Sequence, residues 1–321
     1  MSTAAQQPAP ASPKYPAPAS SENPKSASWE RLEDPDLFLA IDDLSLAAQG
    51  IVEGALQGLH RSRLRGHGAE FDSHREYQGG DDLRYLDWNL YARHGRFFTK
   101  QFQADTNLHL YLLIDATGSM GMKRDTVSKF RYAARAAAAL ALLTRRTRDA
   151  AGLYLLRAGI AEALPPRSRP GQFDDIVALL ESTVPGGAAD VGAALEAVIG
   201  TCRRRGIVVL FSDFLDQEET LMRGMQILRH QGHEVIAVQT LDPWECALPE
   251  NGDFEFEDLE TGQTLRTGTQ DIRDSYARAV ADWRAHLAKD CRAAGIHWVS
   301  AATSDPLIPL VTRCAQLDVA D

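Results

Sequence analysis

Leu110-Tyr-Leu-Leu-Ile-Asp-Ala-Thr-Gly-Ser119 and Ile207-Val-Val-Leu-Phe-Ser-Asp213 decide the fold of this chain. Each stretch is a run of apolar, β-favouring residues that ends at an aspartate. Such runs, bounded by turn residues, are typical of strands buried on both faces of a parallel sheet. Ligands bind such sheets just beyond the carboxyl ends of the strands, where Asp115 and Asp213 are predicted to lie.

The first run continues into a cluster of hard oxygen ligands. Asp115, Thr117 and Ser119 alternate along one turn, and a neighbouring parallel strand would bring Asp213 to the same edge. Two carboxylates so close repel each other unless a cation or a proton lies between them. Carboxylate and hydroxyl oxygens suit Mg²⁺ or Mn²⁺, and no thiol or imidazole is near in the sequence to favour zinc. The sequence therefore predicts a magnesium or manganese site at this edge.

Two other interpretations of these residues stay open. Thr117 or Ser119 could simply cap the next helix while Asp115 ends its strand in a turn. Asp115 could also be an aspartyl nucleophile for metal-dependent phosphoryl transfer, although Thr117 stands where such sites commonly carry a second acid. Because no nucleophile elbow, P-loop or dinucleotide-binding motif is present, we expect a protein that is not an enzyme.

The composition is that of a soluble, globular and acidic protein. The 321 residues are 44% apolar and 24% charged, with a net charge of −10 and a pI near 5.4. The acidic balance argues against generic nucleic-acid binding, and four widely spaced cysteines fit a reducing cytoplasm. No apolar stretch is long enough to cross a bilayer and no signal peptide is evident, so we expect a cytoplasmic protein without a membrane anchor.

Strand and helix patterns alternate from about residue 107 onward, which predicts a doubly wound, mainly parallel α/β sheet. Strands are expected at 109–115, 152–156, 160–164, 207–211, 234–240 and 296–301. Helices are expected from Asp125 or Ser128 to about 146, and at 173–182, 190–204, 218–231, 271–294 and 306–316. The segment 254–265 alternates around a Thr-Gly turn, which predicts a surface hairpin.

Three regions are predicted along the chain. Residues 1–28, rich in proline, alanine and serine, are expected to be a disordered tail. Residues 29–105 are expected to form a helical and extended region, with amphipathic helix within 37–59 that packs on the third region. That third region, 106–321, carries the sheet.

The stretch from residue 61 to residue 100 interleaves basic and aromatic residues. Acidic residues nearly neutralise its charge, unlike a phosphate-binding footprint, so we expect no nucleic-acid partner. Its central block, 63–93, is expected to be structural, with Trp88 buried and with Arg84 and Asp87 ion-paired or hydrogen-bonded. Replacing a buried tryptophan by alanine would then cost about 3–5 kcal/mol.

These residues carry two family resemblances. Asp115-x-Thr117-x-Ser119 with Asp213 resembles the metal-ion-dependent adhesion site of von Willebrand factor A domains. A second pattern is similar to the signature of the bacterial family called "domain of unknown function 58", which precedes a von Willebrand A-like domain. It consists of Arg63-Leu-Arg-Gly-His-Gly-Ala-Glu-Phe71, Arg75-Glu-Tyr77, Gly80-Asp-Asp-Leu-Arg84, Asp87-Trp88 and Ala92-Arg93. The resemblance covers about residues 60–321.

The resemblance also implies a function. Members are typically found beside MoxR-type AAA+ ATPases, which implies a chaperone-like adaptor that works with such an ATPase on a protein client, in complex assembly, maturation or metal insertion. Thr117 and Ser119 would coordinate Mg²⁺ directly, Asp115 and Asp213 directly or through water, and a partner carboxylate would fill the open position. The alternatives are a metal-free scaffold whose aspartates contact basic partner residues and, third, a phosphoryl hydrolase.

One departure from the adhesion-site pattern concerns a second loop, which usually supplies a threonine after Gly-Gly. The equivalent stretch here is Gly186-Gly-Ala-Ala-Asp190, with Ala188 or Ala189 where the hydroxyl is expected. Asp190 is the candidate replacement ligand, directly or through water, and weak or absent metal binding is the other expected outcome.

Overall fold

The computed structural model describes residues 42–59, 69–77, 86–104, 108–124, 127–157, 160–187, 191–215, 218–249, 252–257, 264–269 and 272–316. The predicted disordered tail, 1–28, lies outside these ranges, as do Arg84, Ala188, Ala189 and Asp190. Within the described ranges, no helix combines the length and the apolar character that crossing a membrane requires.

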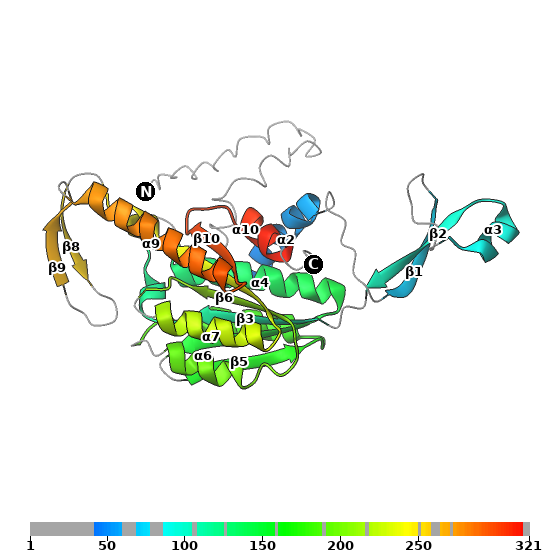
Figure 1. The fold of residues 1–321 in the computed structure, drawn as a ribbon, viewed down its shortest axis with the longest axis horizontal. Helices are drawn as coiled ribbons and strands as arrows, with labels where there is room; N and C mark the ends of the chain where they lie inside the picture. Colours follow the sequence, from blue (N-terminus) through cyan, green and yellow to red (C-terminus); the bar gives the residue numbers. More distant parts are fainter. Residues whose placement is uncertain are drawn as a thin grey trace, which may run out of the picture.

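A mainly parallel sheet forms the centre of the described structure (Figure 1). Its six strands follow the order β10-β7-β6-β3-β4-β5. Neighbouring strands are parallel except for the edge strand β5, which is antiparallel to β4. The strands are β3 (His109–Asp115), β4 (Ala150–Arg157), β5 (Ile160–Arg167), β6 (Ile207–Ser212), β7 (Glu234–Leu241) and β10 (His297–Ala302). Each lies where the sequence predicted a strand, and the doubly wound α/β fold is confirmed.

Helices cover both faces of this sheet. One face packs against α2 (Leu44–Leu59), α4 (Lys129–Thr147), α5 (Gln172–Ser182) and α10 (Leu307–Gln316). The other face packs against α6 (Val191–Ile199), α7 (Glu218–His230) and α9 (Arg273–Ala293). Because strand side chains alternate, Leu112 and Ile114 of β3 enter the first core while Tyr111 and Leu113 enter the second.

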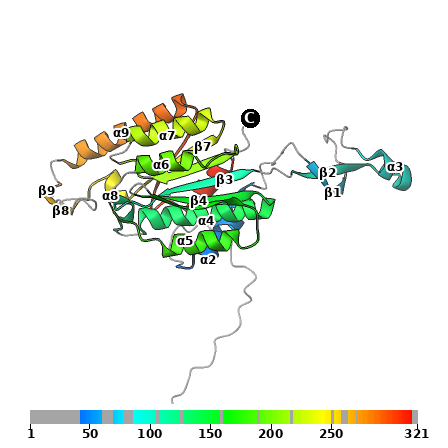
Figure 2. The ribbon, with the colours of Figure 1, turned by 90° about the horizontal axis from the view of Figure 1, so that it is seen from below.

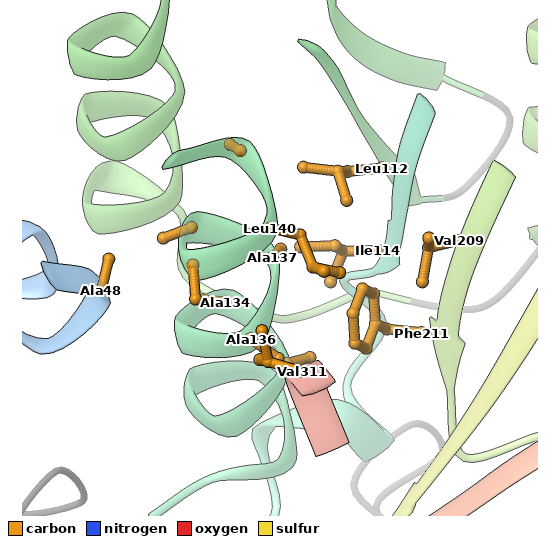
Figure 3. Close-up of a cluster of buried hydrophobic side chains, with 14 of the residues drawn as sticks. Ala48, Leu112, Ile114, Ala134, Ala136, Ala137, Leu140, Val209, Phe211 and Val311 are labelled. Carbon is orange, nitrogen blue, oxygen red and sulfur yellow. The ribbon is translucent and has the colours of Figure 1, made fainter. Parts of the chain in front are cut away.

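The central helix α4 is suited to close packing on the sheet. Ser128 is its N-cap, as one of the two predicted alternatives, and its Oγ accepts a hydrogen bond from the backbone N–H of Arg131 (3.2 Å). Alanines on α4 face Ile114 of β3 and Phe211 of β6 (Figure 3). Ala48 of α2 lies against the other side of α4, so the predicted N-terminal helix belongs to the same core.

Two hairpins stand apart from the sheet in both views (Figures 1 and 2). β1 (Ala69–Glu76) pairs antiparallel with β2 (Phe98–Ala104), and α3 (Trp88–His94) lies near the end of this pair. We call the described residues 69–77 and 86–104 the arm. The second hairpin, β8 (Asp253–Glu257) with β9 (Thr264–Gly268), lies where the sequence predicted it.

The expectation that Trp88 is buried is wrong. The residue is 62% exposed, because it lies on the arm. There its ring meets the rings of Tyr91 (6.3 Å between centroids) and Phe97 (6.4 Å) edge-on and does not pack on the sheet. The Asp87 carboxylate is hydrogen-bonded, as expected: Oδ1 accepts from the backbone N–H of Leu90 (3.0 Å) and caps α3. The penalty expected for removing a buried tryptophan therefore does not apply to Trp88.

Candidate functional site

Two strand ends meet at one edge of the sheet. β3 and β6 are parallel neighbours with Ile114 opposite Phe211, so Asp115 and Asp213 come to the same edge. We call this edge the rim and define it by Asp115, Thr117, Ser119, Ser212 and Asp213. The structure thus brings together four of the predicted site residues, while the fifth, Asp190, lies outside the described residues.

Asp115 is held by hydrogen bonds to both of its carboxylate oxygens. Oδ1 accepts from the backbone N–H of Thr117 (3.0 Å) and Oδ2 accepts from the Ser212 hydroxyl (2.8 Å). The side chain lies almost wholly below the surface, with 3% of the residue exposed. Burial and, second, the negative charge of Asp213 raise the pKa of Asp115 to about 6.

Asp213 closes β6 in a tight turn. Its Oδ1 accepts from the backbone N–H of Leu215 (3.0 Å), while the Ser212 hydroxyl oxygen accepts from the backbone N–H of Phe214 (3.0 Å). Phe214 adopts a left-handed backbone conformation with φ +62°, which is unfavourable for a residue with a side chain. The two hydrogen bonds therefore stabilise a turn that directs the Asp213 side chain into the rim.

A buried lysine lies against Asp213. The Lys129 ammonium, on the first residue of α4, donates to Asp213 Oδ2 (2.7 Å) and to Glu245 Oε1 (2.6 Å). Its side chain is 0% exposed. Burial opposes the charged form, but the attraction of the two carboxylates is larger and raises the pKa of Lys129 above its usual value. The rim therefore lies against a built-in cation that no sequence pattern predicted.

Glu245 reaches the rim from the next strand of the sheet. β7 ends at Leu241, and the next residue, Asp242, is the N-cap of the short helix α8 (Pro243–Cys246). The Asp242 backbone N–H donates to Glu245 Oε2 (2.8 Å), and Asp242 Oδ1 accepts from the backbone N–H of Trp244 (2.9 Å). Burial raises the pKa of Glu245, and the Lys129 charge opposes that rise. Three neighbouring strands, β7, β6 and β3, thus lead to carboxylates at one edge.

The loop that follows Asp115 carries hydroxyls and positive charge. The Thr117 and Ser119 hydroxyls are 3.1 Å apart; Thr117 is buried and Ser119 is half-buried. The same loop continues to Lys123 and Arg124, which are exposed, and the Arg124 guanidinium lies 5.0 Å from the ring centroid of Trp244. A partner at this surface would therefore meet hydroxyl and basic groups before the buried aspartates.

The predicted second loop lies beside the first. The Gly186 backbone N–H donates to the carbonyl of Ala116 (3.0 Å), which joins the Gly-Gly stretch to the loop after Asp115. Gly187 has φ +90°, a left-handed conformation that favours glycine. The proposed substitution of a threonine by Asp190 stays a prediction.

The Lys129 contact at the rim competes with a divalent cation. Asp213 already has a cationic partner, because its Oδ2 accepts a hydrogen bond from the Lys129 ammonium (2.7 Å). Magnesium requires a near-octahedral set of oxygens, and an ammonium in contact with Asp213 would repel a second cation there. The magnesium site stays a prediction that this contact does not favour.

Neither Glu245 nor Lys129 was predicted to belong to the site. A sequence pattern points to Glu245 but not to Lys129. The β7 segment is the third predicted strand that an aspartate follows, here Asp242, so attention to that repeat would have led to Glu245 three residues later. Lys129 carries no such signal. The helix dipole disfavours a lysine in the first turn, and its partners lie 84 and 116 residues away in the sequence.

Comparisons with known proteins identify relatives of this chain. The family model described as "Protein of unknown function DUF58" matches residues 73–286. "Uncharacterized protein Rv1480" of Mycobacterium tuberculosis is 32% identical over 287 residues, which are 88% of this chain and 90% of that protein. Two solved structures are similar at lower identity. The conserved hypothetical protein BatB from Bacteroides thetaiotaomicron is 16% identical (TM-score 0.43; 65% of this chain, 97% of that chain). The SpRpn10 VWA domain is 14% identical (TM-score 0.39; 67% and 98%).

Proposed function

Because the chain belongs to the DUF58 family, we propose that it is a cytoplasmic adaptor that works with a MoxR-type AAA+ ATPase in the assembly or maturation of a protein client. The ATPase partner comes from the family resemblance. The interaction role is supported by the rim itself, where half-buried Ser119 is followed in the same loop by exposed Lys123 and Arg124.

The chemistry of this loop favours an acidic partner segment. Ser119 can donate a hydrogen bond to a carboxylate, and Lys123 and Arg124 supply positive charge beside it. The whole chain carries a charge of −10, which opposes the long-range approach of an acidic partner. A local basic loop overcomes that repulsion at short range. The alternative in which the aspartates contact basic partner groups is less well supported, because Asp115 and Asp213 are buried.

Phosphoryl hydrolysis is also less well supported than protein binding. Asp115 is buried and both of its oxygens accept hydrogen bonds from the protein. The Ser212 hydroxyl is buried as well and is engaged with Asp115 and with the backbone of Phe214. Neither group is presented to a substrate, so our proposal is a binding protein without enzymatic activity.

Co-purification tests the proposal directly. The tagged full-length chain is mixed with a MoxR-type ATPase from the same organism, as the wild type, as Ser119→Ala and as Lys123→Glu/Arg124→Glu. The matched control is Lys289→Glu/Arg292→Glu, which reverses two exposed charges at the end of α9. We expect the rim charge reversal to weaken association by roughly tenfold or more and the control to leave it unchanged.

Two outcomes would contradict parts of this proposal. Equal association of all variants would remove the rim from the interface. Association that is lost with EDTA yet insensitive to the Lys123 and Arg124 changes would instead support the metal-bridged contact predicted from the sequence.

A further inference from the structure

Lys129 occupies a position that a lysine rarely takes without compensation. It begins α4, where the helix dipole is positive and disfavours a cation. It is also fully buried, which disfavours the charged form of the side chain. Both penalties are offset at one point, because the ammonium lies 2.7 Å from an Asp213 oxygen and 2.6 Å from a Glu245 oxygen.

We propose that the Lys129 ammonium is the resident cation of the rim, so that this site is assembled without a divalent metal. In this role the ammonium neutralises the carboxylates of Asp213 and Glu245 and joins the start of α4, the turn after β6 and helix α8. The inference goes beyond the adaptor function, since it concerns how the rim is built and stands whichever partner binds there.

The two acids are positioned for the ammonium by contacts of their own. Glu245 is fixed by the reciprocal hydrogen bonds of the α8 capping box, with its other oxygen bonded to the Asp242 backbone N–H at 2.8 Å. Asp213 is fixed by its turn, with its other oxygen bonded to the Leu215 backbone N–H at 3.0 Å. Each acid therefore directs one remaining oxygen at the same nitrogen. The two acids therefore converge on one cation position, which the Lys129 ammonium occupies.

The location of Asp213 near Asp115, whose loop carries the Thr117 and Ser119 hydroxyls, supports the inference. Asp213 and Asp115 are close enough for the charge of one to act on the other, and Thr117 and Ser119 lie on the loop that follows Asp115. A divalent ion at this rim would share Asp213 with Lys129, and the two cations would repel each other. The Lys129 ammonium and a divalent metal ion are therefore two alternative ways to offset the repulsion between the Asp115 and Asp213 carboxylates.

The test compares how magnesium affects the thermal stability of wild type and of Lys129→Met. Both full-length proteins are freed of metal with EDTA and melted with and without excess MgCl₂. A ligand that binds only the folded state raises the melting temperature. We expect no magnesium effect on wild type. Lys129→Met is expected to melt roughly 10 °C lower, because it leaves buried acids unpaired, and magnesium is expected to restore part of that loss.

Further variants test whether the magnesium effect arises from the lost charge of Lys129. Adding Asp213→Asn to Lys129→Met should recover stability and abolish the magnesium effect, because it removes one uncompensated charge. If Lys129→Met does not fold, Lys129→Gln, which keeps an N–H donor without the charge, takes its place. Lys289→Met, an exposed lysine on α9, is the control and should match wild type.

Three results would overturn the proposal. The first is stabilisation of wild type by magnesium that Asp213→Asn abolishes, which would show a metal site beside Lys129. The second is a Lys129→Met variant as stable as wild type. The third is a destabilised variant that magnesium leaves unchanged, which would make Lys129 an ordinary buried ion pair with no relation to a cation site. None of these results depends on ATPase binding, so the inference and the proposed function fail separately.

Discussion

The rim and the arm contain similar residues in opposite surroundings. At the rim, Lys129 and Asp213 form an ion pair of 2.7 Å with side chains 0% and 2% exposed. On the arm, Arg96 and Glu76 lie 3.7 Å apart with side chains 73% and 66% exposed. The Lys129–Asp213 pair is buried between α4, the turn after β6 and α8, whereas the arm extends away from the sheet in both views (Figures 1 and 2).

This difference shows that the burial of a charged or aromatic residue decides how much it contributes to stability. Its residue type and the number of motif residues around it matter less. The 63–93 block is the richest signature in the sequence, yet its Trp88 is largely exposed. The short Asp115 motif is less distinctive as a pattern, yet its carboxylate is buried and hydrogen-bonded on both oxygens. We therefore expect changes at the sheet and rim to alter stability strongly, and changes on the arm to alter it little.

The largest effect is expected from Phe211→Ala in the sheet below the rim. Phe211 is fully buried between the sheet and α4, opposite Ile114 (Figure 3). Removing the ring should lower the free energy of unfolding by about 3–5 kcal/mol, measured by urea denaturation followed by circular dichroism. Phe211→Leu is the control and should lower it by about 1.5 kcal/mol or less. Equal, small losses for both variants would show that this core is loosely packed.

The next effect is a pH dependence caused by Asp115. Its pKa is raised from 3.8 to about 6 in the folded chain, so the folded state holds this proton more tightly than the unfolded state does. The stability that it contributes is therefore present below pH 4 and is lost as pH rises through 6. The loss amounts to roughly 3 kcal/mol.

Asp115→Asn should remove that dependence. The variant cannot ionise, so its stability should change less between pH 4 and pH 7 than that of wild type, and it should be the more stable protein at pH 7. Denaturation at several pH values in EDTA measures both. A wild-type protein whose stability rises over this interval, and whose rise is absent in Asp115→Asn, would mean that the folded rim lowers the pKa of Asp115.

These expectations also show how far the sequence could lead. Buried strands have long apolar runs, and parallel neighbours end at one edge, so the meeting of Asp115 with Asp213 followed from local pattern and topology. The Lys129 contacts depend on where α4 and α8 are placed relative to each other. The spacing of apolar residues within either segment does not predict that placement. The burial of Trp88 was wrongly predicted because an aromatic residue is buried only where another layer covers it, and the sequence does not say that the arm leaves the sheet.

A smaller loss of stability is expected from Trp88→Ala on the arm. The ring makes edge-on contacts with Tyr91 and Phe97, and most of its surface is exposed. The loss should be about 1 kcal/mol or less, the size of such aromatic contacts. The same urea denaturation as for Phe211→Ala measures it. A loss as large as that of the Phe211 variant would show that another part of the protein covers the ring in solution.

The smallest effect is expected from Glu76→Gln, which removes the exposed ion pair with Arg96. The two side chains are separated by 3.7 Å and surrounded by solvent, and water and salt weaken such pairs. The free energy of unfolding should change by about 0.5 kcal/mol or less in dilute buffer, and the change should vanish in high salt. Lys129→Met should lose stability in both buffers, because salt does not reach the buried carboxylates that the variant leaves unpaired. If the Glu76 change is as large and as insensitive to salt as the Lys129 change, the arm pair is buried in solution and the contrast between the two regions fails.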